Sequence, residues 1–361
     1  MKVLAAMSGG VDSSVMAARL VDAGHDVTGV HLALSKSSSV PGSRGCCTLD
    51  DARDARRVAD KLDIPFYVWD LSEQFREEVM NNFLEEYSHG HTPNPCLRCN
   101  EKIKFLALLD RALDLGFDAV ATGHYAQVVD GPMGKELHRA VDPEKDQSYV
   151  LGMLEQWQLE HSLFPLGGNT KNEVRMEAEQ RGLLTAKKPD SHDICFIPDG
   201  DTAGFLRSKL GDQPGEIVDI ETGQVIAEHE GAFGYTIGQR RGLDLRVPAA
   251  DGKPRYVVDV DISTRKVFVG PPVLLDVDQI IGVRPTWTNT ALSAESVACF
   301  AQVRAHGAPV PAQVRVVDGE VVVDLDEPIR GLATGQGIVL FDRTRVIGSA
   351  TVERTRRVVR T

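Results

Sequence analysis

The sequence has no apolar run that approaches the 18 residues typical of a membrane-spanning helix, and its first ten residues hold too few apolar side chains for a cleavable signal. It also lacks an excess of positive charge, since the formal net charge is −12 and the pI is about 5.3. This balance excludes general coating of a nucleic acid, because such binding depends on Lys and Arg neutralising phosphates. We therefore expect a cytoplasmic protein that meets any RNA partner through a local basic surface.

Cysteines are too sparse for a secreted disulfide framework, because only six occur in 361 residues. They are Cys46, Cys47, Cys96, Cys99, Cys195 and Cys299. In a reducing compartment such residues serve as thiols, metal ligands or redox reagents. Internal repeats and low-complexity tracts are absent from the sequence as well. The length and the hydrophobic content of 42% are sufficient for two or three domains.

Apolar runs alternate with amphipathic stretches through the first 200 residues. The expected strands are residues 3–6, 27–32, 66–69 and 119–121, and the expected helices are residues 15–23, 50–62, 75–87, 101–115 and 170–181. Such alternation predicts an α/β fold with a doubly wound parallel sheet, whose ligands bind at the carboxyl ends of the strands. The polar loop at 35–45 is long enough for a mobile lid, but its pattern assigns it no role.

Short β-rich runs replace this alternation after Pro198-Asp199-Gly200-Asp201, so a domain boundary is expected near residue 200. Beyond Pro271-Pro272, residues 314–317 and 320–324 flank Asp318-Gly319, a type I′ turn signal, and predict a β-hairpin. Three further strand-like runs, at 298–304, 337–341 and 346–352, indicate a small β-barrel. The expected domains are residues 1–200 (nucleotide binding), 201–273 (β-rich) and 274–361 (β-barrel).

A glycine-containing loop, residues 8–13, joins the first strand to the first helix. Gly9 and Gly10 let the backbone approach an anion, the two serines offer hydroxyls, and Asp12 is a candidate Mg²⁺ ligand. The Ser-Gly-Gly-Val-Asp-Ser motif lacks the Gly-Lys-Ser/Thr ending of a Walker loop, so it brings no lysine to the phosphates. It resembles the PP-loop of ATP pyrophosphatases, which split ATP into AMP and pyrophosphate. An ordinary strand-to-helix turn is the alternative.

Two further segments carry chemistry. Cys96 and Cys99 directly precede an expected helix, whose dipole stabilises a thiolate, although half a zinc site or a redox pair fits the spacing equally well. Cys195 follows the Lys187-Lys188 pair and lies among polar residues, a setting that also favours thiolate. The adjacent Cys46 and Cys47 are too close for usual zinc spacing. Cys299 lies in an alternating apolar run and is expected in a core.

An ordered set of motifs extends along the chain: Ser8 to Ser13, Asn94-Pro95 with Cys99-Asn100 and Lys104-Phe105, Ala121 to Tyr125, Lys145 to Tyr149, Asp190-Ser191 with Ile194 to Ile197, Gly238 to Arg240, and Gly335-Gln336. In these motifs the whole chain resembles the bacterial tRNA-specific 2-thiouridylases. The resemblance implies an ATP-dependent, AMP-forming sulfurtransferase that replaces the C2 oxygen of the wobble uridine at tRNA position 34 by sulfur.

The resemblance also implies roles for individual residues. ATP, with Mg²⁺, would be bound by Ala6, Met7, Ser8, Gly9, Gly10, Val11, Asp12, Ser13, Leu32 and Gly123. Cys195 would carry a persulfide received from a sulfur-relay protein or cysteine desulfurase, and Cys99 would resolve the adduct. The target base or the tRNA would be contacted by Asn94, Pro95, Cys96, His124, Lys145, Asp146, Gln147 and Gln336. For His124 and Gln336, a purely structural role is the alternative.

Cys96 departs from the pattern, since some family members have Asp at this position. The third nearby cysteine leaves a second route open, in which Cys96, Cys99 and Cys195 bind an iron–sulfur cluster and no persulfide forms. Two other functions also stay open from the residues: a PP-loop ligase that adenylates a small metabolite, and a non-catalytic nucleotide-dependent RNA-binding module.

A protein with a negative net charge can still bind tRNA if basic side chains form a local positive surface. The candidates are Lys102, Lys104, Lys187, Lys188, Arg240, Arg241, Arg354, Arg356, Arg357 and Arg360. A solvated charged surface is the alternative for each pair.

Overall fold

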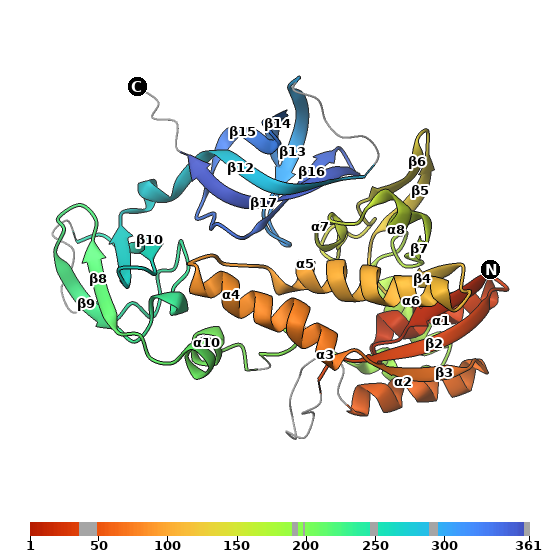
Figure 1. Cartoon of the computed structure of the whole chain (residues 1–361). Helices are drawn as coiled ribbons and strands as arrows, with labels where there is room; N and C mark the ends of the chain where they lie inside the picture. The colour runs from red at the N-terminus through yellow and green to blue at the C-terminus, as the bar shows by residue number, and fades with distance from the viewer. Residues whose placement is uncertain (36–48, 190–193, 198, 246–251, 289–294, 357–361) are drawn as a thin grey trace.

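The structure, a computed structural model, describes residues 1–35, 49–189, 194–197, 199–245, 252–288 and 295–356 (Figure 1). Nearly all of the loop at 35–45, residues 190–193 and the side chains of Cys46, Cys47, Arg357 and Arg360 lie outside these ranges. None of the helices in the described ranges is both long and apolar enough to cross a membrane.

The N-terminal half is built on a parallel sheet of five strands in the order β3-β2-β1-β4-β7. The strands are β1 (Lys2–Ala6), β2 (Asp26–Ala33), β3 (Phe66–Asp70), β4 (Ala119–Ala121) and β7 (Ser162–Leu163). The chain winds outward from β1 to β3 and then returns to place β4 on the other side of β1. The point between β1 and β4 is therefore the switch point at which ligands bind in such folds. The predicted doubly wound α/β fold is confirmed.

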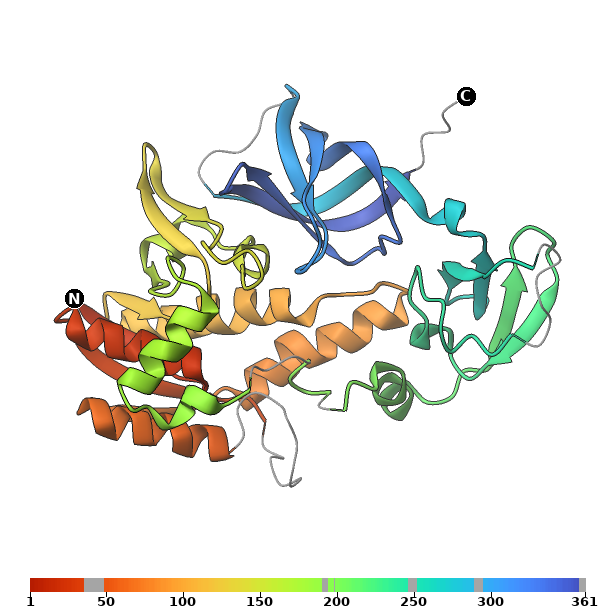
Figure 2. The ribbon, with the colours of Figure 1, turned by 180° about the vertical axis from the view of Figure 1, so that it is seen from behind.

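Helices cover both faces of this sheet (Figure 2). Side chains of successive strand residues point to opposite faces, so Val3 and Ala5 of β1 pack in one cluster while Leu4 packs in another. The first cluster contains α1, α2 and α9, and the second contains the two long helical segments described next. The bounds of these three helices are α1 (Val11–Asp22), α2 (Leu49–Leu62) and α9 (Lys171–Gln180). Burial on both faces explains why β1 is apolar throughout.

Two long helical segments lie side by side and lead toward the nucleotide-binding half (Figure 1). The first comprises α3 (Ser72–Phe75), the π-helical η1 (Arg76–Asn81) and α4 (Asn82–Ser88), and the second comprises α5 (Pro95–Cys99), the π-helical η2 (Asn100–Ala107) and α6 (Leu108–Asp114). The second helix begins six residues before the expected 101, because Asn94 caps it and Pro95 occupies its first position. Cys99 consequently lies inside the helix rather than before it.

The remaining strands form two further sheets. The central sheet has the order β10-β11-β8-β9, and the C-terminal barrel is closed by pairing of β12 with β17. Their bounds are β8 (Gly215–Asp219), β9 (Val225–His229), β10 (Tyr256–Asp261), β11 (Lys266–Gly270), β12 (Asp276–Trp287), β13 (Val297–Gln302), β14 (Val310–Val317), β15 (Glu320–Arg330), β16 (Gly337–Asp342) and β17 (Arg345–Arg356). Asp318 and Gly319 both have positive φ, 51° and 81°, as a type I′ turn requires, so the predicted hairpin is confirmed.

Sequence reasoning missed a hairpin, β5 (Gln127–Gly131) with β6 (Gly134–His138), that leaves the N-terminal half and joins the sheet of the barrel. Arg139, just after it, reinforces this contact, since its guanidinium lies 3.6 Å from the ring centre of Phe341 and donates to Gln302 at 2.8 Å. The remaining helical elements are α7 (Ser148–Leu151), α8 (Gln156–Glu160), η3 (Leu184–Lys187), α10 (Thr202–Leu210), η4 (Ala232–Gly234) and η5 (Pro272–Leu275).

A buried ion pair in the central sheet gives a test of this packing. Arg255 and Asp219, both nearly inaccessible, lie 2.9 Å apart. Burial opposes ionisation of Asp219, but hydrogen bonds from Arg255 and from the backbone of Thr222 outweigh it and hold its pKa below the ordinary 3.8. Because the pKa is lower in the folded state, this stabilisation is present above about pH 4 and is lost as the pH falls through the folded-state value.

Replacing Arg255 with Met should lower the free energy of unfolding by about 3 kcal/mol at pH 7, because it leaves a buried carboxylate without its cation. The loss should shrink in acid as Asp219 becomes protonated. The matched control Lys266→Met removes an exposed pair with Glu216 in the same sheet and should cost less than about 0.5 kcal/mol. Urea titrations at pH 7 and at an acid pH measure the free energy of unfolding of each variant. Equal losses for the two variants would contradict the account.

Candidate functional site

The PP-loop motif lies at the carboxyl end of β1, where it turns into α1. Gly9 has a φ of +79°, and a Cβ there would lie 2.2 Å from the carbonyl oxygen of Asp51 at the start of α2. Gly10 is the N-cap of α1 and has no side chain to cap the first turn. The first N–H groups of α1 therefore lack a side-chain cap from Gly10, and uncapped N–H groups at a helix start suit an anion.

The end of β4 presses against this loop. A Cβ on Gly123 would lie 2.8 Å from the backbone nitrogen of Ser13, so only glycine permits this approach. This observation places Gly123 beside the loop, as the prediction for ATP binding requires.

His124, the next residue, is buried between the rings of Phe105 and Phe164 and pairs with the hydroxyl of Thr122 at 2.7 Å. Burial lowers the pKa of His124 well below 6.5, with a smaller contribution from Lys104. The imidazole is therefore neutral at physiological pH. Its surroundings in the protein agree with the structural alternative.

Two lysines from distant parts of the chain supply the positive charge that the loop itself lacks. The ammonium group of Lys171, at the first position of α9, lies 2.7 Å from both carboxylate oxygens of Asp12, which also accepts from the hydroxyl of Tyr125. Lys188 donates to the carbonyl oxygen of Gly9 at 3.0 Å and pairs with Asp51 and Asp54.

Sequence reasoning missed Lys171, because a helix-capping signal gives no hint of contact with a loop 159 residues earlier. Sequence reasoning gave Lys188 two roles, one beside a thiolate or a bound phosphate and one in a basic surface for tRNA, and the structure places it at the PP-loop. Burial opposes the charge of Lys188, but the two carboxylates outweigh it and raise its pKa. Lys188 therefore stays charged under physiological conditions.

The chemistry of Asp12 fits a Mg²⁺ ligand. Its carboxylate is partly exposed beside the anion position, and Mg²⁺ commonly uses one or two carboxylates together with substrate phosphates and water. ATP and its metal ion would then share this corner with Lys171.

The cysteines predicted to be catalytic converge on one hydrophobic cluster. Cys99 belongs to the cluster beneath the second face of the sheet, and Cys195 packs against that same cluster. Leu32 is a member and Ala6 packs against it, so two residues expected at the nucleotide also contact this cluster. Cys99 is buried, whereas Cys195 is half-buried.

Cys96 differs from Cys99 in burial: it is exposed in the first turn of α5, whereas Cys99 is buried one turn later. Among the residues that the structure describes, which include all three of these cysteines, no group of three His, Cys, Asp or Glu side chains is placed to bind a metal ion. This arrangement does not fit a cluster held by Cys96, Cys99 and Cys195. The fourth described cysteine, Cys299, is buried in the barrel, where burial raises its pKa to about 12.

The segment expected at the target base is positioned by several contacts. The Asn94 side chain accepts hydrogen bonds from the backbone nitrogens of Cys96 and Leu97, at 3.0 and 3.3 Å, and Pro95 is buried behind it. Gln336, predicted to contact tRNA, donates from its side chain to the carbonyl oxygen of Thr92. In this structure Gln336 therefore connects the barrel to the Asn94 segment.

Residues 145–147, which are predicted to contact tRNA, are partly exposed and also make contacts within the protein. The carboxylate of Asp146 pairs with Arg139 at 2.9 Å and accepts from Ser148, while the side chain of Gln147 accepts from the backbone nitrogen of Tyr125 at 2.9 Å. Lys145 is partly exposed. Asp146 and Gln147 thus hold the end of β4 and the barrel contact in place.

The remaining basic candidates differ in pairing and in exposure. Lys102 pairs with Glu101, and the exposed Arg354 pairs with Glu320. Lys104 is partly buried. Lys187, Arg240, Arg241 and Arg356 are also exposed.

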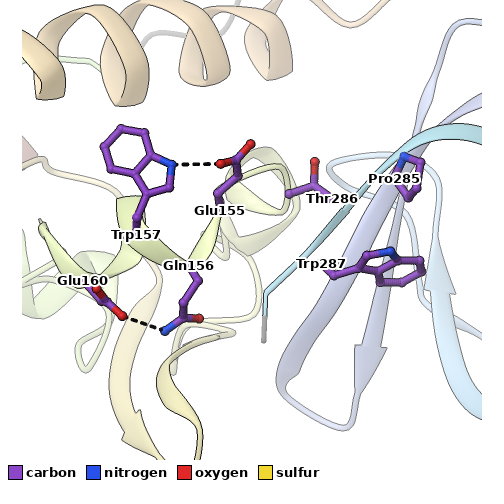
Figure 3. Close-up of a pocket in the computed structure, with 7 residues that line it drawn as sticks. All are labelled: Glu155, Gln156, Trp157, Glu160, Pro285, Thr286 and Trp287. Carbon is purple, nitrogen blue, oxygen red and sulfur yellow. Dashed lines mark hydrogen bonds between the residues drawn. The ribbon is translucent and has the colours of Figure 1, made fainter. Parts of the chain in front are cut away.

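A cleft of about 580 Å³ opens elsewhere, between α8 and the end of β12 (Figure 3). Its lining includes Trp157, whose indole donates to Glu155 at 2.8 Å, and Trp287 on the barrel side. None of the predicted site residues lines this cleft.

Comparison with known proteins identifies the family of the chain. Family models described as tRNA methyl transferase HUP domain, tRNA methyl transferase PRC-barrel domain and Aminomethyltransferase beta-barrel domain match residues 1–199, 203–271 and 277–352. The tRNA-specific 2-thiouridylase MnmA of Acidothermus cellulolyticus is 62% identical over 359 residues, covering 99% of both chains. That of Streptomyces avermitilis is 60% identical over 362 residues, covering 99% of this chain and 96% of the relative.

Among solved structures, a 4-thiouridine synthetase in complex with RNA and ATP is similar at a TM-score of 0.32 and 16% identity, covering 57% of this chain and 50% of that one. This similarity is too low to add weight. The full-length identity to the curated relatives, together with the family model that matches the N-terminal half, is sufficient to assign the family. The chain therefore belongs to the tRNA-specific 2-thiouridylase family of the PP-loop superfamily.

Proposed function

We propose that this chain thiolates the wobble uridine of tRNA at C2, using ATP to activate the oxygen and a cysteine persulfide to replace it. The observation that carries the proposal is the shared cluster: Cys99 and Cys195 pack in the same hydrophobic layer as Ala6 and Leu32, two residues expected at the nucleotide. Activation and sulfur transfer would thus occur on neighbouring parts of one site.

Activation comes first, because the C2 oxygen of uridine is a poor leaving group. The carbonyl oxygen attacks the α-phosphate of ATP, pyrophosphate leaves, and the oxygen becomes part of an AMP ester. The backbone N–H groups after Gly10 and the ammonium group of Lys171 would stabilise negative charge that develops on the phosphates. Bound Mg²⁺, held in part by Asp12, would screen the phosphate charges.

Sulfur transfer follows at the same carbon. The terminal sulfur of a Cys195 persulfide attacks C2, AMP leaves, and a C2–S–S–Cys195 adduct results. The Cys99 thiolate then attacks the Sγ atom of Cys195, which releases 2-thiouridine and leaves a Cys99–Cys195 disulfide. Before the next turnover, a dithiol reductant must reduce this disulfide and is itself oxidised to a disulfide. In a variant of this step, the Cys99 thiolate attacks the Sγ atom of the Cys195 persulfide first, and the hydrosulfide that is freed attacks C2 and displaces AMP. This variant requires the same two cysteines and leaves the same disulfide.

The other candidate functions fit less well. A PP-loop ligase for a small metabolite would use the same sheet but has no need for Cys99 and Cys195 in one cluster. An RNA-binding module without catalysis would need neither cysteine. The description of the matching family model names methyl transfer, but a PP-loop beside two cysteines is the chemistry of adenylation and sulfur transfer rather than of methylation.

The partners follow from this chemistry. The tRNA would contact the exposed Lys187, Arg240, Arg241 and Arg356, and its target base would enter beside Asn94 and Cys96. A persulfide donor, either a sulfur-relay protein or a cysteine desulfurase, would load Cys195. We expect the reaction in the cytoplasm, because tRNA is found there and thiols stay reduced there.

Single replacements of Cys99 and Cys195 by Ser should each abolish thiolation while tRNA binding stays within about threefold, because each removes one reacting sulfur and little contact area. Nucleoside mass spectrometry of the tRNA measures the product. The matched control is Cys299→Ala, which removes a buried thiol in the barrel and should leave thiolation intact. Thiolation by both single serine variants would overturn the proposal.

Replacing Lys171 with Met should reduce release of AMP and pyrophosphate by about 100-fold, because it removes the positive charge next to the phosphates. Lys61→Met, which removes an ammonium group that caps the carbonyls of Arg181 and Gly182 on the surface, is the control and should leave release unchanged. Formation of ADP instead of AMP would contradict PP-loop chemistry here.

Protein purified without oxygen should thiolate tRNA with persulfide as the sulfur source while containing no stoichiometric iron or acid-labile sulfide. The separation of exposed Cys96 from buried Cys99 is the physical reason for this expectation. Iron analysis on the same sample as the activity assay tests it. Activity that rises in proportion to bound iron would favour the cluster route instead.

A further inference from the structure

One turn of the barrel, residues 334–337, lies against the segment that leads into α5. The backbone nitrogen of Thr92 donates to the carbonyl oxygen of Thr334 at 2.8 Å. A Cβ on Gly335 would lie 2.9 Å from Cβ of His91, and a Cβ on Gly337 would lie 2.5 Å from a methyl carbon of Leu97. The two glycines thus let the barrel approach the catalytic segment more closely than any other residue would.

Tyr149 occupies the centre of this junction. It is among the largest fully buried side chains of the protein, and its hydroxyl donates to the carbonyl oxygen of Gly337 at 3.0 Å. Its oxygen also interacts with the side chain of Asn94. Burial raises the pKa of Tyr149, and the hydrogen bond with Asn94 opposes this rise. The phenol is therefore protonated under all physiological conditions and remains a donor.

The hydrogen bonds around Asn94 have a fixed direction. The Oδ1 atom of Asn94 accepts from the backbone nitrogens of Cys96 and Leu97 at the start of α5. The side chain of Asn94 lies near the phenol oxygen of Tyr149, which donates its hydrogen to Gly337. Leu97 packs against the hydrophobic cluster that contains Tyr149, so contacts run from the barrel through Tyr149 to the first turn of the helix that contains Cys99.

A second hydrogen bond, just after Cys99, fixes the other end of α5. The side chain of Asn100, the residue after Cys99, is buried and donates to the carbonyl oxygen of Val150 at 2.7 Å. Tyr149 and Val150 are adjacent in α7, so this short helix holds α5 both through its cap and through Asn100. Cys99 lies between these two points of attachment.

We propose that Tyr149 is a positioning residue for sulfur transfer, whose hydroxyl joins Gly337 of the barrel to the Asn94 cap and so fixes the place of Cys99 in the site. This inference rests on the proposed role of Cys99 as the resolving thiol. The barrel would then have a role besides RNA contact, because its packing against the segment before α5 positions a catalytic residue.

The test is Tyr149→Phe, which keeps the buried ring and removes only the hydroxyl. The rate at which iodoacetamide alkylates the buried Cys99 should rise by at least about threefold, because the first turn of α5 loses its anchor and opens more often. Trypsin cleaves after Arg98 and places Cys96 and Cys99 on separate peptides, so mass spectrometry reads each thiol alone. The kcat for thiolation should fall about tenfold while the KM for ATP stays unchanged.

The matched control is Tyr87→Phe. Tyr87 is also buried, and its phenol hydrogen-bonds Thr236 of the central domain instead of the barrel. This variant should leave the alkylation of Cys99 unchanged. If Tyr149→Phe proves unstable, Gly337→Ala tests the same junction from the barrel side, since its added methyl group must displace Leu97.

An unchanged alkylation rate for Cys99 in folded Tyr149→Phe, or an equal change in Tyr87→Phe, would overturn the inference. The alkylation readout needs neither ATP nor tRNA. Failure of the proposed function would instead appear as thiolation by both the Cys99→Ser and the Cys195→Ser variants, so the two failures are distinguishable.

Discussion

The burial of strand β1 on both faces is the constraint on which the site depends. Side chains of a strand alternate in direction, so Val3 and Ala5 point toward α1 and α9 while Leu4 points toward the long helices with Cys99. The loop after β1 therefore begins at the boundary between two layers. One layer contains Lys171, which we propose meets the phosphates, and the other contains the two cysteines that we propose transfer sulfur.

This arrangement explains how an acidic protein treats two anionic substrates. The nucleotide meets positive charge inside the fold, where Lys171 and Lys188 are held by carboxylates from other elements before any ligand binds. Charges arranged in advance do not have to be collected during the reaction, which is the usual source of electrostatic catalysis. In the proposed function, the tRNA would contact exposed arginines and lysines on the surface instead.

The fold of the N-terminal half could be predicted from its sequence, because each strand and helix there has a strong period of its own. The hairpin at Asp318-Gly319 was equally accessible, since only a type I′ turn needs two residues with positive φ in that order. The start of α5 was misplaced, although Asn94-Pro95 is a cap signal, because the cysteines drew the interpretation toward a loop. The β5–β6 hairpin was missed because its pairing partner lies in the barrel.

The candidate site could be predicted only where its residues are contiguous. Ser8 to Ser13 form one motif, whereas Lys171 and Tyr149 reach the site through tertiary contacts that no local pattern records. His124 and Gln336 illustrate the reverse case. Resemblance assigned both to the tRNA, but packing between aromatic rings and a hydrogen bond to Thr92 show that each also has a structural task.

The central claim is that ATP activation and sulfur transfer act on C2 of one uridine. The most direct measurement is a reaction of the purified full chain with tRNA, ATP, Mg²⁺ and a persulfide donor, followed by digestion and nucleoside mass spectrometry. The account predicts 2-thiouridine at the wobble position, dependent on ATP and accompanied by an equal amount of AMP. Unmodified uridine under these conditions, or a methylated nucleoside in its place, would contradict it.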